Sequence, residues 1–125
     1  MNKVINTDKA PKAIGPYSQA ILAGNTLYIS GQVPIDPATG KLAEGGITEQ
    51  TEQVMKNIKA ILDEAGFTFA DVVKSTCLLA SMDYFKPMNE VYGKYYPANS
   101  PARAAFAVAG LPMGALVEIE TIAVK

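Results

Sequence analysis

The stretch from Ile47 to Ala65 constrains the fold more than any other part of the chain. Apolar residues recur along it at the spacing of one face of an α-helix. They are Val54, Met55, Ile58, Ile61, Leu62 and Ala65. Thr48 can cap the first turn, which also holds glutamates, and Gly66 is a typical terminator. The pattern predicts a long helix whose apolar face must pack against another layer of structure.

Shorter apolar runs on both sides of this helix indicate β-strands. The predicted strands are residues 4–5, 20–23, 26–30, 71–80, a strand that begins at Arg103, and 116–124. The dipeptide Gly24-Asn25 predicts a hairpin with a type II′ turn between the second and third strands. The 71–80 strand is largely apolar on both sides, which indicates a central strand in which Cys77 is a buried, inert side chain.

The order of the elements favours one α+β domain over residues 1–125. A second helix is predicted over residues 83–96, with Asp83 as its cap and Pro87 in or just after its first turn. The economical packing is a mixed six-stranded sheet with both helices on one face. Since 49% of the residues are hydrophobic, the opposite face of the sheet is also expected to be apolar, with nothing left to cover it. We therefore expect subunits to associate through that face.

Composition excludes several kinds of chemistry. With no histidine and a single cysteine, the chain offers neither a zinc site nor an internal disulfide, and we expect no metal or cofactor. A net charge of −1 and a pI near 5.4 disfavour binding to nucleic acid. No apolar run approaches the roughly 18 residues that span a membrane, and residues 1–12 lack the apolar segment of a signal peptide. The expected location is the cytoplasm.

Arg103 is the only arginine of the chain, and it stands at the head of an apolar run. Its guanidinium is a planar fork that can bind a carboxylate through two parallel hydrogen bonds, which a lysine cannot do. Glu118 and Glu120 interrupt another apolar run in the same way. Two interpretations remain open. Arg103 forms a structural ion pair with an acid of the chain, or it binds the carboxylate of a ligand.

The spacing of Arg103 and Glu118 leads to a geometric hypothesis. If their strands form an antiparallel hairpin around Pro112 and Met113, the two residues lie roughly 15 Å apart along the sheet. They could not then contact one small ligand within a single chain. We therefore expect any site that uses both side chains to lie between neighbouring subunits.

Four segments form a pattern that is known from one family. They are GPYSQA at residues 15–20, YISGQVP at 28–34, PAR at 101–103 and VEIE at 117–120. Through these segments the chain resembles, over essentially its full length, the RidA family, also called YjgF. The resemblance implies a homotrimer of the chorismate-mutase-like α+β fold with clefts between subunits. It also implies hydrolysis of 2-imino acids, such as 2-iminopropanoate and 2-iminobutanoate, to 2-oxo acids and ammonia.

The resemblance also implies roles for individual residues. Arg103 matches the carboxylate-binding arginine, and Glu118 matches the acid/base glutamate. Other matching cleft positions are Tyr17, Ser30, Gly31 and Asn89. Ala105 stands where the deaminase branch usually has cysteine, and its backbone carbonyl could still position the attacking water. Because an imine carbon is electrophilic, oriented water and one proton shuttle through Glu118 or Tyr17 can suffice without metal or cofactor.

Two other functions are compatible with the same residues. A non-enzymatic protein that senses 2-oxo acids or other small carboxylic acids would need Arg103 but would accelerate no reaction. An endoribonuclease or translation inhibitor is a third interpretation, against which the absence of histidine and the acidic pI weigh. A direct assay of imine hydrolysis separates the enzyme from the sensor.

Overall fold

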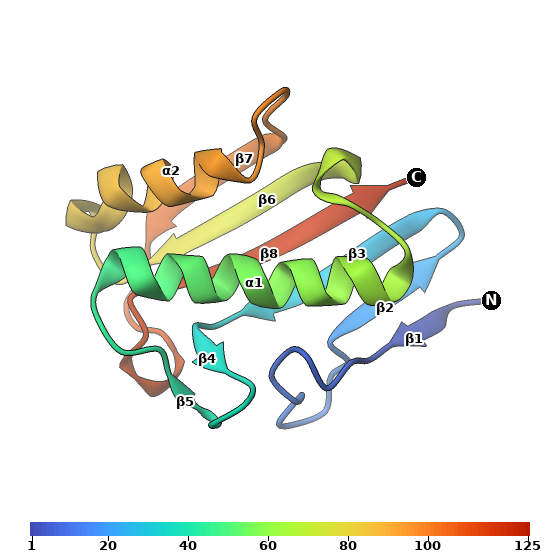
Figure 1. Cartoon of the computed structure of the whole chain (residues 1–125), viewed down its shortest axis with the longest axis horizontal. Helices are drawn as coiled ribbons and strands as arrows, with labels where there is room; N and C mark the ends of the chain where they lie inside the picture. The colour runs from blue at the N-terminus through green and yellow to red at the C-terminus, as the bar shows by residue number, and fades with distance from the viewer.

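Six strands form one curved, mixed sheet in the computed structural model, which describes residues 1–125 (Figure 1). The strands are β1 (Lys3–Ile5), β2 (Ala20–Ala23), β3 (Thr26–Gln32), β6 (Val72–Leu79), β7 (Ala102–Ala107) and β8 (Val117–Val124). Their order across the sheet is β1-β2-β3-β8-β6-β7, and only the β6–β7 pair is parallel. The predicted mixed sheet of six strands is confirmed.

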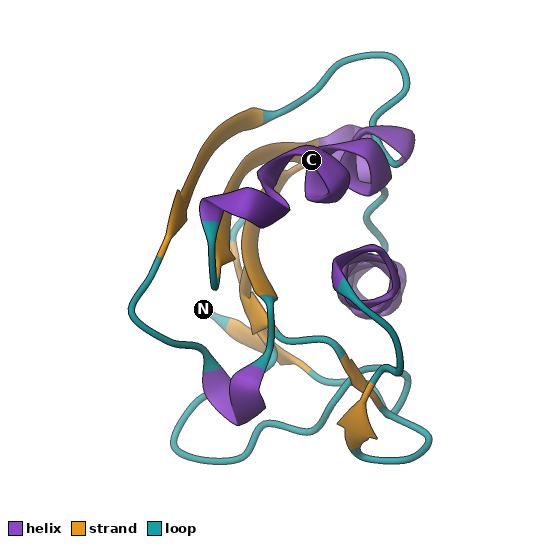
Figure 2. Ribbon diagram, turned by 90° about the vertical axis from the view of Figure 1, so that its left-hand side faces the viewer, coloured by secondary structure: helices purple, strands orange, loops and turns teal.

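Two helices, α1 (Ile47–Ala65) and α2 (Phe85–Lys94), cover the same face of this sheet (Figure 2). Neither helix combines the length and the apolar character that a membrane span requires. Smaller elements connect the layers. They are β4 (Ile35–Asp36), β5 (Lys41–Leu42) and the 3-10 turns η1 (Phe69–Asp71), η2 (Met82–Tyr84) and η3 (Pro112–Gly114). The prediction that both helices pack on one face is confirmed.

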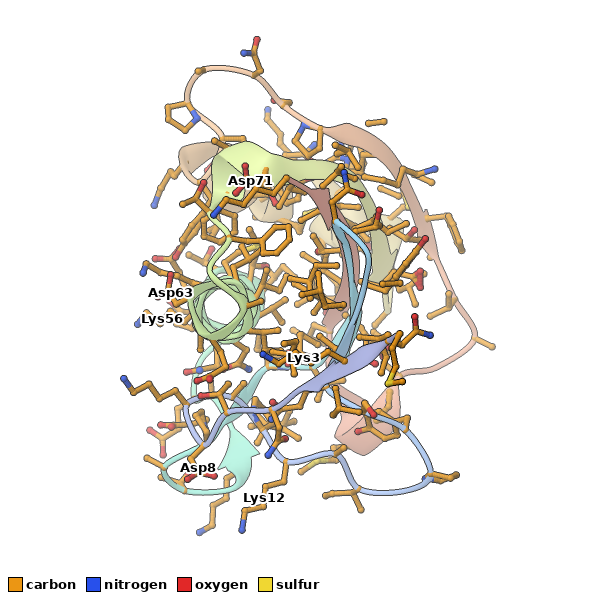
Figure 3. All side chains as sticks on the ribbon, turned by 90° about the vertical axis from the view of Figure 1, so that its right-hand side faces the viewer. Lys3, Asp8, Lys12, Lys56, Asp63 and Asp71 are labelled. Carbon is orange, nitrogen blue, oxygen red and sulfur yellow. The ribbon has the colours of Figure 1, made fainter.

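Helix α1 has the predicted bounds, but its N-terminus is capped differently. The backbone N–H of Gly46 donates to Glu49 Oε1 over 2.8 Å, whereas Thr48 makes no cap. Glu49 reaches back because it lies three residues into the helix, where its carboxylate also meets the positive end of the helix dipole. The apolar face of α1 is buried against the sheet except for Ala65 at its end, which is partly buried. Lys56 and Asp63 point away from the sheet (Figure 3).

The β2–β3 hairpin has the predicted turn. Ala23 pairs with Thr26, Gly24 has a φ of 61°, and Asn25 has no positive φ. A type II′ turn needs this combination, with glycine at the first central position.

Strand β6 differs from the prediction at its start. Its pairing with β8 shifts between Val72 and Lys74, so one extra residue interrupts the alternation of sides. Val73 is consequently exposed, whereas Ser75, Cys77 and Leu79 face the helices and are buried. The strand is interior to the sheet, as predicted, but its other side is only half-buried.

Helix α2 is shorter than the predicted 83–96. Residues Met82–Tyr84 form a 3-10 turn, which Ser81 caps by accepting the N–H of Asp83 over 3.1 Å. The α-helix begins at Phe85, with Pro87 in its first turn as predicted, and ends at Lys94. Asp83 is therefore not the cap, because the preceding serine takes this position.

The hairpin assumed for β7 and β8 is wrong, because β6 lies between these two strands. Strand β7 follows β6 through α2, and a helical crossover of this kind returns the chain parallel to the first strand. Strand β8 then inserts antiparallel between β3 and β6.

The face of the sheet that carries no helix is rich in apolar side chains. By register, this face holds Val4, Ile21, Tyr28, Leu78, Phe106 and Ile122. Among them, Val4, Tyr28 and Phe106 are 59%, 50% and 47% exposed, which is unusual for large apolar residues. We call this surface the open face. Its apolar character is what the sequence predicts for a face that binds other subunits.

Candidate active site

Arg103 lies on β7 with its side chain beneath α2. Its Nη1 donates a hydrogen bond to Asn89 Oδ1 over 2.7 Å. Its guanidinium carbon is 5.0 Å from the ring centroid of Tyr92 and 5.5 Å from that of Phe85. A guanidinium that contacts aromatic faces and an amide oxygen is held in a defined plane.

No carboxylate of the chain pairs with Arg103. The one ion pair in the structure joins Lys59 and Asp63, at 2.7 Å, on the outer surface of α1. The structure therefore does not support the interpretation that Arg103 forms an internal ion pair. Asn89 accepts from only one of the N–H donors of the Arg103 guanidinium, so several charged donors of Arg103 are available to an external anion.

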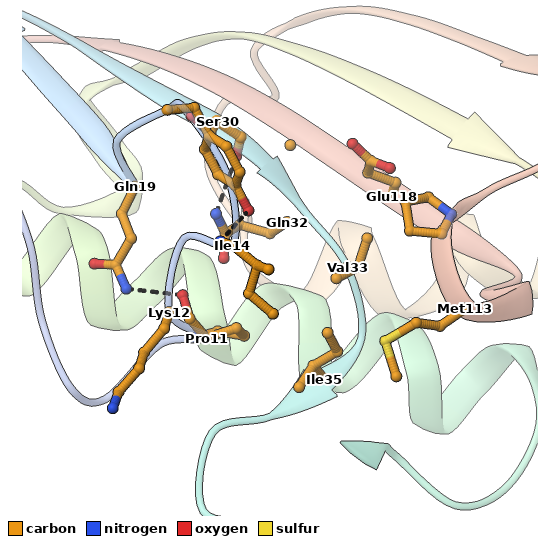
Figure 4. Close-up of a pocket in the computed structure, with 13 residues that line it drawn as sticks. Pro11, Lys12, Ile14, Gln19, Ser30, Gln32, Val33, Ile35, Met113 and Glu118 are labelled. Atoms are coloured by element: carbon orange, nitrogen blue, oxygen red, sulfur yellow. Dashed lines mark hydrogen bonds between the residues drawn. The ribbon is translucent and has the colours of Figure 1, made fainter. Parts of the chain in front are cut away.

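A second group of the proposed site residues lines a cleft of about 560 Å³ near the loop that precedes β2. Tyr17, Ser30, Gly31 and Glu118 contribute to its wall. Figure 4 shows Glu118 and Met113 on one side of the cleft, and Ile14 and Pro11 on the other. The wall combines apolar residues with several polar ones, among them Lys12, Gln19 and Gln32. A mixture of apolar surface and a few placed polar groups is typical of small-molecule sites.

Gly31 allows the carboxylate of Glu118 to lie against the backbone of β3. A Cβ built on Gly31 would overlap Glu118 Oε2 and would lie 2.9 Å from Glu118 Cδ. The pairing of β3 with β8 shifts between Ile29 and Gln32, which opens the sheet at this point. Any larger residue at position 31 would therefore displace Glu118.

The pKa of Glu118 is raised above its ordinary value. Partial burial is the larger cause, and the negative charge of Glu120 is the second. No hydrogen-bond donor or cation of the chain compensates its carboxylate. A carboxyl group with a raised pKa is suited to accepting and returning a proton.

Hydrogen bonds hold the polar residues of the cleft in place. Ser30 Oγ donates to the carbonyl of Ser18 over 2.6 Å, and Tyr17 Oη accepts the N–H of Ile14 over 3.3 Å. The buried Gln19 accepts from the N–H of Thr7 over 2.8 Å and donates to backbone carbonyls of the loop that follows. The position of Tyr17 therefore depends on the loop between Thr7 and Ile14, which the side-chain amide of Gln19 holds in place.

Sequence reasoning missed two residues that shape this cleft. Gln19 belongs to the GPYSQA segment, but nothing in the residues of that segment indicated that the amide of Gln19 would be buried and would hold a loop in place. Met113 lines the cleft with a φ of 58°, the left-handed conformation that a non-glycine residue rarely adopts. Its place between Pro112 and Gly114, both turn-forming residues, was the available signal.

One protomer does not bring the two groups together. Arg103 aligns with Ser75 on the side of the helices, whereas Glu118 aligns with Leu78 on the open face. Three residues along the strands and two strand spacings separate them, roughly 10 Å in each direction. The predicted hairpin between the strands of Arg103 and Glu118 does not form. The two residues are nevertheless far apart within one protomer, as that hypothesis expected.

Ala105 lies directly across from Cys77 in the β6–β7 pair. Cys77 is fully buried, as predicted, and burial raises its pKa to about 11 although the nearby charge of Arg103 lowers it. The thiol is therefore protonated near neutral pH. A protonated thiol is a poor nucleophile, which agrees with an inert side chain.

The fold has two helices on one face of a sheet, and the site has a free arginine and a cleft that contains Glu118. Together they define one class of protein, which comparison with known families identifies. The family model described as Endoribonuclease L-PSP matches residues 7–125. The chain belongs to this family, the RidA family to which its sequence is similar.

Several relatives match over nearly their whole length. The human 2-iminobutanoate/2-iminopropanoate deaminase is 50% identical over 125 residues, which cover 100% of this chain and 91% of that protein. A RutC family protein of Pyrococcus horikoshii is 55% identical and covers 100% and 99% of the two chains. Among solved structures, RidA from an Antarctic Psychrobacter is 50% identical with a TM-score of 0.95, covering 98% of this chain and 99% of that one. Escherichia coli TdcF with bound serine is 37% identical with a TM-score of 0.94, covering 98% of each chain.

Proposed function

We propose that this protein hydrolyses reactive 2-imino acids, including 2-iminopropanoate and 2-iminobutanoate, to 2-oxo acids and ammonia. The observation that carries the proposal is the guanidinium of Arg103, which is held by Asn89 and two aromatic rings yet pairs with no acid. Such a group is suited to binding a substrate carboxylate. Human, mouse and bovine relatives named 2-iminobutanoate/2-iminopropanoate deaminase, at 50–54% identity, support the reaction type.

We also propose that the protein is a homotrimer whose active sites lie between subunits. Two observations support this arrangement. The open face presents large exposed apolar side chains. The side chain of Arg103 lies on the helix-covered side of the sheet, whereas that of Glu118 lies on the open face. In a trimer with a threefold rotation axis, Arg103 of one subunit and Glu118 of its neighbour can together complete one site, and the same pairing repeats at each interface.

The chemical step needs only groups of this chain and water. Arg103 binds the carboxylate of the imino acid through two hydrogen bonds and so orients the C=N bond. Glu118 in its ionised form accepts a proton from water, and the oxygen attacks the imine carbon while the C=N electron pair moves to nitrogen. The backbone carbonyl of Ala105 helps to position this water.

Ammonia leaves in a second proton transfer. Glu118 returns the proton to the nitrogen, directly or through Tyr17, and the C–N bond breaks as the oxygen forms the carbonyl of the 2-oxo acid. In the same step Glu118 transfers the remaining hydroxyl proton from the oxygen to the departing nitrogen, which leaves as NH3 while Glu118 returns to its ionised form. The balance is therefore imino acid plus water to 2-oxo acid plus ammonia. The partners proposed are thus this small molecule and other copies of the chain, in the cytoplasm, without nucleic acid or membrane.

The ionisation of Glu118 predicts the acid limb of the pH profile. Because the ionised form is the base, kcat/KM is expected to fall as the pH drops through the raised pKa of Glu118. In Glu120→Gln, one of the two causes of the raised pKa is gone, so the acid limb should move to lower pH. In Glu118→Gln, activity should fall about 100-fold or more and lose this limb. An acid limb that stays in place in Glu120→Gln would contradict the assignment.

A direct assay tests the reaction itself. A serine or threonine dehydratase generates the imine in the cuvette, and formation of the 2-oxo acid is followed with and without this protein. Acceleration in proportion to the protein concentration is expected. Binding of 2-oxobutanoate without any acceleration would instead identify a carboxylic acid sensor.

A further inference from the structure

Four buried hydroxyl groups lie together next to Arg103, and nothing in the proposed reaction uses them. We call them the hydroxyl cluster, which consists of Ser75, Tyr92, Tyr96 and Thr121. These residues are 1%, 4%, 6% and 1% exposed, and none of their hydroxyl oxygens has a hydrogen-bond partner of good geometry. Buried polar groups in proteins are nearly always paired, so such a concentration calls for an explanation.

The cluster lies directly behind the arginine. Ser75 and Thr121 occupy the same rung of the sheet as Arg103, on the side that the helices cover. Tyr92 and Tyr96 approach from α2 and the residues just after it, with ring centroids 4.8 Å apart. Burial raises the pKa of Tyr92, and the hydroxyls of Ser75 and Tyr96 are close enough to influence it as well. The four groups can therefore share hydrogen bonds within the cluster, directly or through water.

Hydrophobic packing alone does not account for Tyr92. A phenylalanine would fill the same space without burying a hydroxyl. The ring of Tyr92 is also the aromatic group nearest to the guanidinium, at 5.0 Å against 5.5 Å for Phe85. Tyr92 therefore contacts Arg103 with its ring and the hydroxyl cluster with its other end.

We infer that Tyr92 is a positioning residue, which the hydroxyl cluster fixes in place so that its ring sets the plane of the Arg103 guanidinium. Asn89 restrains one edge of the fork at Nη1, and Tyr92 restrains its face. The inference rests on the proposed binding of a carboxylate by Arg103. It adds that carboxylate affinity depends on a tyrosine that does not itself touch the substrate.

This role has a kinetic signature. The carboxylate keeps its charge throughout the reaction, so Arg103 binds it equally well in the ground state and in the transition state. Loss of positioning should therefore act mainly on KM and on the Kd of the 2-oxo acid product, whereas the poorer orientation of the C=N bond should add only a smaller fall in kcat. A merely structural defect would lower the amount of active protein and hence kcat, without a selective change in Kd.

The test measures 2-oxobutanoate binding by calorimetry, together with kcat and KM for the imine. We expect Tyr92→Leu, which removes the ring, to weaken binding about tenfold. We expect Tyr92→Phe, which removes only the hydroxyl, to weaken it about threefold. The matched controls are Tyr95→Leu and Tyr95→Phe. Tyr95 is a neighbouring tyrosine whose hydroxyl donates to Glu52 over 3.2 Å, and these variants should bind within twofold of wild type.

Unchanged Kd values in both Tyr92 variants would overturn the inference, as would an equal loss in the Tyr95 controls. If Tyr92→Leu fails to fold, Tyr92→Phe decides the question, because its ring preserves the packing. The proposed deaminase function is judged separately. If the Tyr92 variants bind 2-oxobutanoate more weakly but the wild type hydrolyses no imine, the inference is retained and the function is rejected. If the wild type hydrolyses the imine but the Tyr92 variants bind with unaltered Kd, the function is retained and the inference is rejected. A wild-type protein that does not bind 2-oxobutanoate would overturn the inference, whereas the function would still be decided by the imine assay.

Discussion

Mixing two inactive variants, Arg103→Ala and Glu118→Gln, is expected to restore about one quarter of the wild-type activity. Each variant alone lacks one of the two groups in every site. In a trimer that contains both kinds of subunit, one of the three interfaces combines the intact Arg103 of one subunit with the intact Glu118 of its neighbour. Random mixing in equal amounts places both kinds in about three quarters of the trimers, so about a quarter of all sites are complete.

The experiment unfolds and refolds the two variants together and follows imine hydrolysis, with native mass spectrometry to verify that subunits have mixed. A matched control mixes Glu118→Gln with the double variant Arg103→Ala/Glu118→Gln. No intact Glu118 is present in that mixture, so it should remain inactive. Mixed trimers without activity would show that the two residues do not meet across an interface.

Arg103→Lys is expected to keep the fold and the assembly and to lose most of the activity. Lysine supplies a point charge on a flexible stem, so it cannot form both parallel hydrogen bonds to the carboxylate, and the contacts with Asn89 and Tyr92 are weakened. Lysine can still donate one of these two bonds, so the net loss is about one hydrogen bond to a charged group, or about 1.5–3 kcal/mol. This corresponds to a roughly 10- to 150-fold loss in kcat/KM. The measurement is hydrolysis of imines generated from serine or threonine.

The reverse exchange provides the control for that variant. Lys59→Arg changes a lysine of the exposed pair with Asp63, far from the proposed site, and should leave the rate unchanged. Circular dichroism and size-exclusion chromatography verify that Arg103→Lys retains the structure. A rate near that of the wild type would remove Arg103 from substrate binding.

The sequence alone determined the local elements of this protein. Periodicity placed α1 at its observed bounds, because a helical stripe of large apolar residues cannot be accommodated by another regular structure. Gly24-Asn25 determined the β2–β3 turn, since few residues tolerate the backbone that a type II′ turn requires. Arg103 was recognisable as a candidate because a fork-shaped cation inside an apolar run needs an anionic partner.

Only the tertiary structure decided which strands are neighbours and which side chains face each other. Strand β6 separates β7 from β8, and no local pattern encodes that pairing, because it depends on contacts between distant segments and on the crossover through α2. No local pattern encodes the register shift between Val72 and Lys74 either, which changed the side of the sheet that Val73 faces. The same holds for the register shift in β3 near Gly31, where Glu118 lies against the backbone. The contacts of Arg103 with Asn89 and Tyr92, and its separation from Glu118, follow from this strand order. Local propensity acts over a few residues, whereas the position of a site is set by the packing of the whole sheet.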